Sequence, residues 1–277
     1  MTYDKNFLDH VDRLIKQRPI SAKTLAPFRD LVLFMTQSDP KVESVVLEER
    51  LRNIKQEEGF PLFSREDLPL DVAAFSDLLA SFLEHLGNSK RNDKRELKKA
   101  LEKSKSTPDW TLNLFQCLLK QDEDTLAKIG TDVGLDPGVL RFLGIIALKP
   151  SLHTLRDALS QNIDKEAWDH GYCPLCGSQP SMAYFDETGK RYLHCELCGE
   201  EWAYPRLNCP FCRNQDHETL GYFHSDDEEG YRVDFCRKCL RYLKTVDKRV
   251  FENPAPMELE YLATIHLDIL ANEHGFK

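Results

Sequence analysis

Four Cys-x-x-Cys pairs crowd into the C-terminal part of the chain, and they constrain its fold more than any other feature. A Cys-x-x-Cys turn presents two sulfur atoms on one side of a tight loop, so two such turns can surround one metal ion tetrahedrally. Four pairs therefore predict two metal sites. The pairs are Cys173 and Cys176, Cys195 and Cys198, Cys209 and Cys212, and Cys236 and Cys239.

The same region repeats internally, and the repeat chooses which pairs share an ion. Residues 173–176 read Cys-Pro-Leu-Cys, and residues 209–212 read Cys-Pro-Phe-Cys. Residues 189–198 and 230–239 share the pattern Gly-x-Arg-x-x-x-Cys-x-x-Cys. Each repeat therefore reads as one complete module of knuckle, strand, turn, strand and knuckle. Site one is predicted to be Cys173, Cys176, Cys195 and Cys198, and site two to be Cys209, Cys212, Cys236 and Cys239.

Other uses of paired cysteines fit this sequence less well. Nothing at the N-terminus resembles an export signal, and thiols of unexported proteins stay reduced, so disulfides are not expected. A redox-active pair calls for a thioredoxin-like βαβ pattern, which the sequence does not show. A module of under about 40 residues needs a metal ion to fold. We therefore expect two metal ions, one per site, and the four-sulfur sets leave zinc and iron open.

The predicted sites are closed, and they differ in their knuckles. Four sulfur ligands leave no open position for metal hydrolysis, so we predict no catalytic and no cofactor-binding residue beyond the metal ligands. Glycine follows two knuckles of site one, at Gly177 and Gly199, whereas Arg213 and Leu240 follow those of site two. We expect site two to be the more exposed and labile. Candidate cations for the thiolate charge are Arg191, Arg206, Arg232 and Arg237.

The N-terminal part reads as a helical domain. Apolar residues recur at spacings of three and four, as in Phe7, Val11 and Leu14. The pattern ends near residue 160, and cysteine, glycine and aromatic residues then become frequent. Cys117 lies in an apolar helical stretch and reads as a buried free thiol. After residues 7–15 and 25–35, further helices are expected at about 42–57, 71–86, 92–104, 109–120, 122–133 and 137–148.

These patterns predict an α plus small β fold with four parts. They are a helical domain at 1–166, a first four-cysteine ribbon at 167–206, a second at 207–251, and a C-terminal segment at 252–277. One helix from Glu258 to His274 is expected to pack on the body through its apolar stripe. The formal charge of −9 disfavours binding to nucleic acids and to anionic membranes. The sequence leaves open whether the chain forms a homo-oligomer.

Several C-terminal segments resemble the formate dehydrogenase accessory proteins, and the resemblance extends in order over roughly residues 168–277. It implies a helical domain followed by two rubredoxin-like modules, and it implies iron binding. It also implies a cytoplasmic maturation factor, not an enzyme, that binds the catalytic subunit of formate dehydrogenase. The segments are Cys173 to Pro180, Arg191 to Trp202, Cys209 to Cys212, Cys236 to Cys239 and Leu262 to Leu270.

Two other functions are compatible with tandem four-cysteine ribbons. The first is a zinc ribbon that binds nucleic acid, which would need basic and stacking residues grouped on one face. Between Cys173 and Val250 the charges nearly balance, which speaks against it. The second is a rubredoxin-like electron carrier with iron in its sites. The maturation factor is the leading hypothesis.

Overall fold

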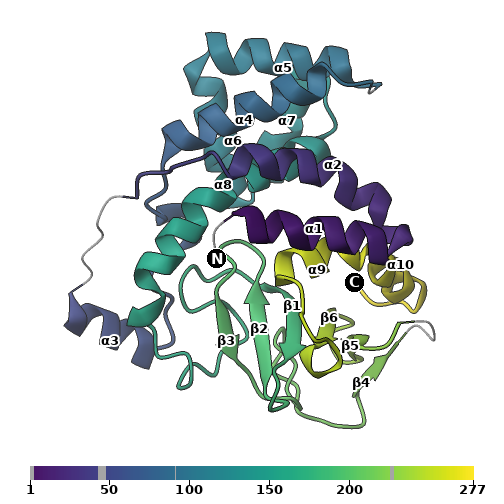
Figure 1. Ribbon diagram of the computed structural model, residues 1–277. Helices are drawn as coiled ribbons and strands as arrows, with labels where there is room; N and C mark the ends of the chain where they lie inside the picture. The colour runs from purple at the N-terminus through teal and green to yellow at the C-terminus, as the bar shows by residue number, and fades with distance from the viewer. Residues whose placement is uncertain (1–2, 43–47, 91, 225–227) are drawn as a thin grey trace.

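Helices form the upper layer of the molecule, and one small sheet forms most of the lower layer (Figure 1). The computed structural model describes residues 3–42, 48–90, 92–224 and 228–277. Among these residues, no helix combines the length and the apolar character that crossing a bilayer requires. The predicted fold class, a helical part followed by two small cysteine-bearing ribbons, is confirmed.

The helices of the N-terminal half follow the predicted pattern. Aspartate side chains cap several of them, and Asp136 accepts hydrogen bonds from two amides of the first turn of α8. Of the stretch predicted at 42–57, residues 49–57 are helical, and residues 43–47 lie outside the described part of the chain. The helices are α1 (Lys5–Gln17), α2 (Pro19–Met35), α3 (Glu49–Glu57), α4 (Val72–Gly87), α5 (Lys94–Ser106), α6 (Pro108–Lys120), α7 (Glu123–Val133) and α8 (Pro137–Leu159).

Helix α8 is longer than the sequence pattern indicated. It was expected to end at residue 148, before Pro150, but it continues to Leu159 with the proline in its interior. Proline inside a helix costs about 3 kcal/mol because it removes one backbone hydrogen bond. The turns beyond it are held by burial, since Leu152 and Leu155 are at most 1% exposed. The extended helix runs from the helical layer down to the level of the first ribbon (Figure 1).

The two ribbons are joined in one six-stranded sheet with the order β3-β2-β1-β6-β5-β4. Strands within each ribbon pair antiparallel, and β1 pairs with β6 in parallel, so that Met182 lies opposite Lys244. The sequence repeat predicted two modules, and the structure places them side by side in the same orientation. The strands are β1 (Pro180–Phe185), β2 (Arg191–Cys195), β3 (Glu201–Ala203), β4 (Leu220–Phe223), β5 (Tyr231–Cys236) and β6 (Tyr242–Asp247).

The hydrophobic core divides unequally between the ribbons. Residues of the first ribbon, including Leu175, Leu197 and Trp202, belong to the same buried cluster as the helical layer. A second cluster joins strand residues such as Val233 and Val246 to the C-terminal helices. The first ribbon is therefore an integral part of the helical body, whereas the second packs mainly against the C-terminal helices.

The prediction of one C-terminal helix from Glu258 to His274 is wrong in one respect. The segment forms two short helices, α9 (Met257–Ala263) and α10 (Ile265–Glu273), separated at Thr264. Side chains from elsewhere satisfy the backbone carbonyls at this break. Ser21 donates to the Ala263 carbonyl at 2.6 Å, and the buried Lys244 amine donates to that of Tyr261 at 3.0 Å. These distant partners stabilise an interruption that the local apolar stripe does not reveal.

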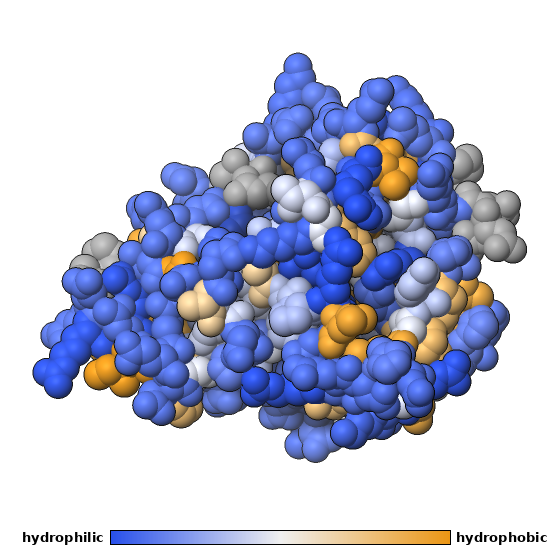
Figure 2. Space-filling model, turned by 90° about the horizontal axis from the view of Figure 1, so that it is seen from below, coloured by the Kyte–Doolittle hydropathy of each residue, from blue (hydrophilic) through white to orange (hydrophobic). Residues whose placement is uncertain are grey.

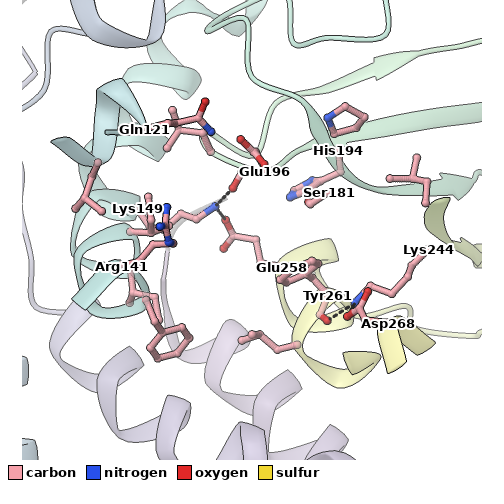
Figure 3. Close-up of a pocket in the computed structure, with 18 of the residues that line it drawn as sticks. Gln121, Arg141, Lys149, Ser181, His194, Glu196, Lys244, Glu258, Tyr261 and Asp268 are labelled. Carbon is pink, nitrogen blue, oxygen red and sulfur yellow. Dashed lines mark hydrogen bonds and ion pairs between the residues drawn. The ribbon is translucent and has the colours of Figure 1, made fainter. Parts of the chain in front are cut away.

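A buried carboxylate, Glu258, connects the C-terminal helices to the helical layer (Figure 3). Its oxygens lie 2.9 Å from the Lys149 amine, 2.9 Å from the His153 ring and 2.7 Å from the Tyr3 hydroxyl. Burial alone would raise the pKa of Glu258, but the neighbouring His153 and Lys149 hold it well below its ordinary value. Burial lowers the pKa of His153, so Lys149 supplies the balancing charge. The Lys149 amine also donates to the Glu196 carbonyl of the first ribbon at 3.1 Å.

We predict that Glu258→Gln lowers the free energy of unfolding by about 3 to 5 kcal/mol, because the Lys149 amine would stay buried without its counter-charge. Urea denaturation of the metal-loaded protein measures this loss. Glu273→Gln, an exposed carboxylate in α10, is the matched control and should change stability by less than about 0.5 kcal/mol. Equal effects of the two substitutions would contradict the role given to Glu258.

Candidate metal centres

The structure brings the eight paired cysteines together in two groups of four, with the pairing that the repeat predicts. Within each group, the four sulfur atoms all lie within 4.8 Å of one another. The two groups are site one, with Cys173, Cys176, Cys195 and Cys198, and site two, with Cys209, Cys212, Cys236 and Cys239. No cysteine of the chain forms a disulfide.

The sulfur spacing suits a tetrahedral ion. The Sγ atoms of Cys176 and Cys195 lie 3.5 Å apart in site one, and those of Cys212 and Cys236 lie 3.7 Å apart in site two. A metal–sulfur bond of about 2.3 Å places the ligands of a regular tetrahedron roughly 3.8 Å apart. A disulfide would need about 2.05 Å. Each group can therefore hold one metal ion.

The knuckles of both sites share one backbone conformation. The amide of the residue directly after the second cysteine closes the turn, as Gly177 N donates to the Cys173 carbonyl at 2.9 Å and Arg213 N to that of Cys209 at 2.9 Å. The residue after each knuckle is left-handed, with φ of +71° at Gly177 and Gly199, +59° at Arg213 and +61° at Leu240. Glycine adopts this region freely, whereas other residues are destabilised there by roughly 1 to 2 kcal/mol.

Site one lies directly beneath the helical layer. Its four cysteines are at most 1% exposed. The segment between α3 and α4 runs along its first knuckle, where Leu62 N donates to the Pro174 carbonyl at 2.9 Å and Phe63 N to that of Leu175 at 3.0 Å. Arg65 adds a 2.9 Å ion pair to Glu196, between the cysteines of the second knuckle. Residues of the segment between α3 and α4 thus cover both knuckles.

The glycines of site one are required by this close packing as well as by their φ. A Cβ at Gly177 would lie 3.2 Å from the Pro61 ring, and one at Gly199 would lie 3.0 Å from the Arg156 guanidinium. Arg156, from α8, is 8% exposed and donates to the Gly199 carbonyl at 3.4 Å. It is one of the cations next to site one, and no sequence pattern indicated it because its partner lies 43 residues away.

Site two faces outward. Cys212 and Cys239 are partly exposed, and Leu240 is 48% exposed. Among the predicted cations, Arg191 lies near this site, where its guanidinium donates to the Asn208 carbonyl at 3.2 Å, one residue before Cys209. The Asn214 side chain donates to the Cys236 sulfur at 3.6 Å. The expected greater exposure of site two is confirmed.

The thiols of the two sites and the ninth cysteine are in different settings. Burial raises the pKa of Cys173 and Cys198 well above the ordinary thiol value, so an ion entering site one must displace protons. Cys117 lies apart in α6, where burial raises its pKa to about 11. Its thiol donates to the Leu114 carbonyl at 3.2 Å. It is a buried core residue, as the sequence predicted.

Comparison with known proteins connects this arrangement to one family. The family model described as "FdhE, central domain" matches residues 172–206, which contain site one. A protein from Aquifex aeolicus named "Protein FdhE homolog" is 34% identical over 166 residues, 58% of each chain. One of the same name from Stutzerimonas stutzeri is 31% identical over 51% of this chain and 47% of its own. The aligned segments thus span about half the length of these relatives.

A solved structure resembles the whole fold. The crystal structure of the FdhE protein from Pseudomonas aeruginosa superposes with a TM-score of 0.71 and covers 98% of this chain and 90% of its own. At 21% identity this match establishes the shared fold alone. The family model and the relatives carry the FdhE name in common, and they support the resemblance to the formate dehydrogenase accessory (FdhE) family that the cysteine segments indicated.

Proposed function

We propose that the eight cysteines are the ligands of two metal ions, one in each site, and that the ions are zinc or iron. The sulfur spacing, the all-thiol donor set and the knuckle backbone support this assignment. An ion bound in site one would lie among thiols of which burial raises the pKa of Cys173 and Cys198, and it would favour their thiolate forms. It would also supply the stability that each small ribbon cannot gain from its own core.

The two ions would serve different purposes. Site one lies between the ribbon and the helical layer, so an ion there would lock the two layers together. Site two is open to solvent on one side, so its ion would shape an exposed surface. Four thiolate ligands leave no coordination position for a substrate in either site. The arrangement supports binding and not metal catalysis.

The function that this geometry supports best is that of a maturation factor for formate dehydrogenase, acting in the cytoplasm on the enzyme's catalytic subunit. The observation that carries the proposal is the FdhE fold with one internal and one outward-facing four-cysteine site. A rigid body with one metal-shaped exposed face suits the recognition of a folded or partly folded client. Its role is accessory, so no substrate turnover is expected.

Association with the client tests this proposal. The reduced, metal-loaded protein is immobilised and challenged with the purified catalytic subunit of formate dehydrogenase from the same organism. We expect specific retention that is lost after metal removal, because metal-free ribbons lose their fold. Absence of binding in the reduced, metal-loaded state would contradict the proposal.

A second prediction concerns metal removal. We expect a mild chelator to remove the ion of site two before that of site one, since two cysteines of site two are partly exposed and all four of site one are buried. Timed chelation followed by metal analysis and thiol labelling with mass spectrometry shows which cysteines become reactive. Early labelling at Cys212 and Cys239 is the expected result, and earlier labelling of Cys173 or Cys198 would contradict it.

The variant Leu240→Gly tests the same prediction by changing the rate of ion release from site two. Glycine relieves the left-handed strain at φ +61° and exposes no core surface, because Leu240 is 48% exposed. We expect the variant to release its site-two ion about five- to tenfold more slowly, which corresponds to roughly 1 kcal/mol. The rate at site one should not change.

A further inference from the structure

A groove of about 540 Å³ crosses the sheet where the two ribbons meet, and it is strongly basic. Residues from both ribbons line it, including Cys209 and Cys236 of site two. We call it the arginine groove because Arg191, Arg206, Arg232, Arg241 and Arg249 line it, whereas Asp234 is the one carboxylate among the described residues of its lining. Thiolates of Cys209 and Cys236 in a metal-loaded site two would offset part of this positive charge. The chain as a whole carries a charge of −9, so this local excess of positive charge is a departure from the rest of the protein.

Aromatic rings hold the guanidinium groups of the groove in place. Arg206 and Arg232 both lie over the Phe185 ring, at 4.8 and 4.6 Å from its centroid. Arg232 also lies 4.5 Å from the Tyr222 centroid, and Arg241 lies 3.8 Å from that of Phe211. A guanidinium stacked on a ring keeps its N–H edge free for a planar acceptor such as a carboxylate. The groove is thus organised before any ligand binds.

The positive charges are only partly neutralised within the protein. Asp234 forms ion pairs with two cations, at 2.9 Å from Arg232 and 3.5 Å from Arg191. Arg249 forms a separate ion pair with Asp247 at 2.6 Å. Arg206 and Arg241 are exposed and have no carboxylate partner among the described residues. The Arg206 guanidinium donates to the Gly189 carbonyl, but its charge and that of Arg241 are not balanced by a described carboxylate, so both remain able to attract an acidic ligand.

The groove wall also contains a polar group that lacks a partner. Asn208 is 7% exposed, and its side-chain oxygen accepts no hydrogen bond from any described residue. Because the protein itself shields this oxygen from solvent, it is not a ligand contact, and the exposed arginines are the groups that a ligand in the groove would reach.

We propose that the arginine groove binds an extended, acidic segment of a partner protein. This inference rests on the proposed function and names the surface through which the client would dock. Carboxylates of the segment would pair with Arg206 and Arg241, while apolar side chains would contact the exposed Leu207 and Tyr222. Single-stranded nucleic acid fits less well, because its bases need open aromatic faces and arginines already lie over Phe185, Tyr222 and Phe211.

The face of the molecule seen from below favours docking guided by charge. Seen from below, the molecule presents a mostly hydrophilic face on which hydrophobic residues form small, separate patches (Figure 2). No broad apolar area stands out in this view. A partner that approaches such a face gains its specificity mainly from charged and hydrogen-bonding groups.

The experiment compares the metal-loaded wild-type protein with Arg206→Gln/Arg241→Gln. A fluorescent glutamate-rich decapeptide and the dehydrogenase catalytic subunit are titrated separately at two salt concentrations. The double variant should bind both at least tenfold more weakly, since each lost charged hydrogen bond accounts for a factor of ten or more. The control Arg50→Gln/Arg95→Gln removes two exposed arginines outside the groove and should bind as the wild type does. The metal content of every variant is measured, and two ions per chain show that the variant is folded.

The outcomes separate the two proposals. Equal binding of the catalytic subunit by the wild type and by the groove variant would contradict the groove as the docking surface. The proposed maturation role would then still be supported. If the wild type fails to bind the subunit, the proposed function fails, and the decapeptide still tests the groove. Tighter binding of a single-stranded oligonucleotide than of the decapeptide, lost in the groove variant, would also overturn the acidic segment as ligand.

Discussion

The contact between site one and the helical layer is the constraint on which the rest of the structure depends. The segment from Pro61 to Arg65 and helix α8 reach the two knuckles of site one from the same layer. They can do so only because glycine stands at Gly177 and Gly199, where any side chain would meet Pro61 or Arg156. The site therefore acts as a joint. Its ribbon shares a hydrophobic core with the helices, and its ion would hold a fold that neither layer completes alone.

The second ribbon is attached to this joint in a different way. It continues the sheet through the parallel pairing of β1 with β6, and the C-terminal helices cover it. Its own metal site borders the arginine groove, and two of its cysteines are partly exposed. One repeat has thus become part of the core while the other has kept an exposed surface. A division of this kind lets a protein keep a rigid body and offer one outward face to a partner.

Much of this arrangement could be predicted from the sequence, because the informative patterns are local. The repeat of residues 189–198 at 230–239 predicted the grouping of the cysteines, and Gly177 and Gly199 against Arg213 and Leu240 predicted the difference in exposure. Apolar periodicity predicted the helices. Each of these features acts within a few residues of the atoms that it organises.

The features that the sequence did not show depend on distant partners. The pairing of β1 with β6 joins backbone edges and leaves no side-chain pattern. Helix α8 passes Pro150 because its later turns are buried, and the break at Thr264 is supported by Ser21 and Lys244. Arg156 and Glu258 gain their roles from residues that lie 43 and 105 to 109 positions away in the sequence. Such contacts exist only once the layers have been assembled.

Hydrogen–deuterium exchange tests most directly whether site one is the joint between the layers. The comparison uses Cys176→Ser and Cys212→Ser, each losing one ligand of one site, with metal content checked in both. The amides of Leu62 and Phe63, which bond to the first knuckle, report on the joint. We expect Cys176→Ser to speed their exchange by at least about tenfold and Cys212→Ser to leave it unchanged. Equal protection of these amides in the two variants would contradict this expectation.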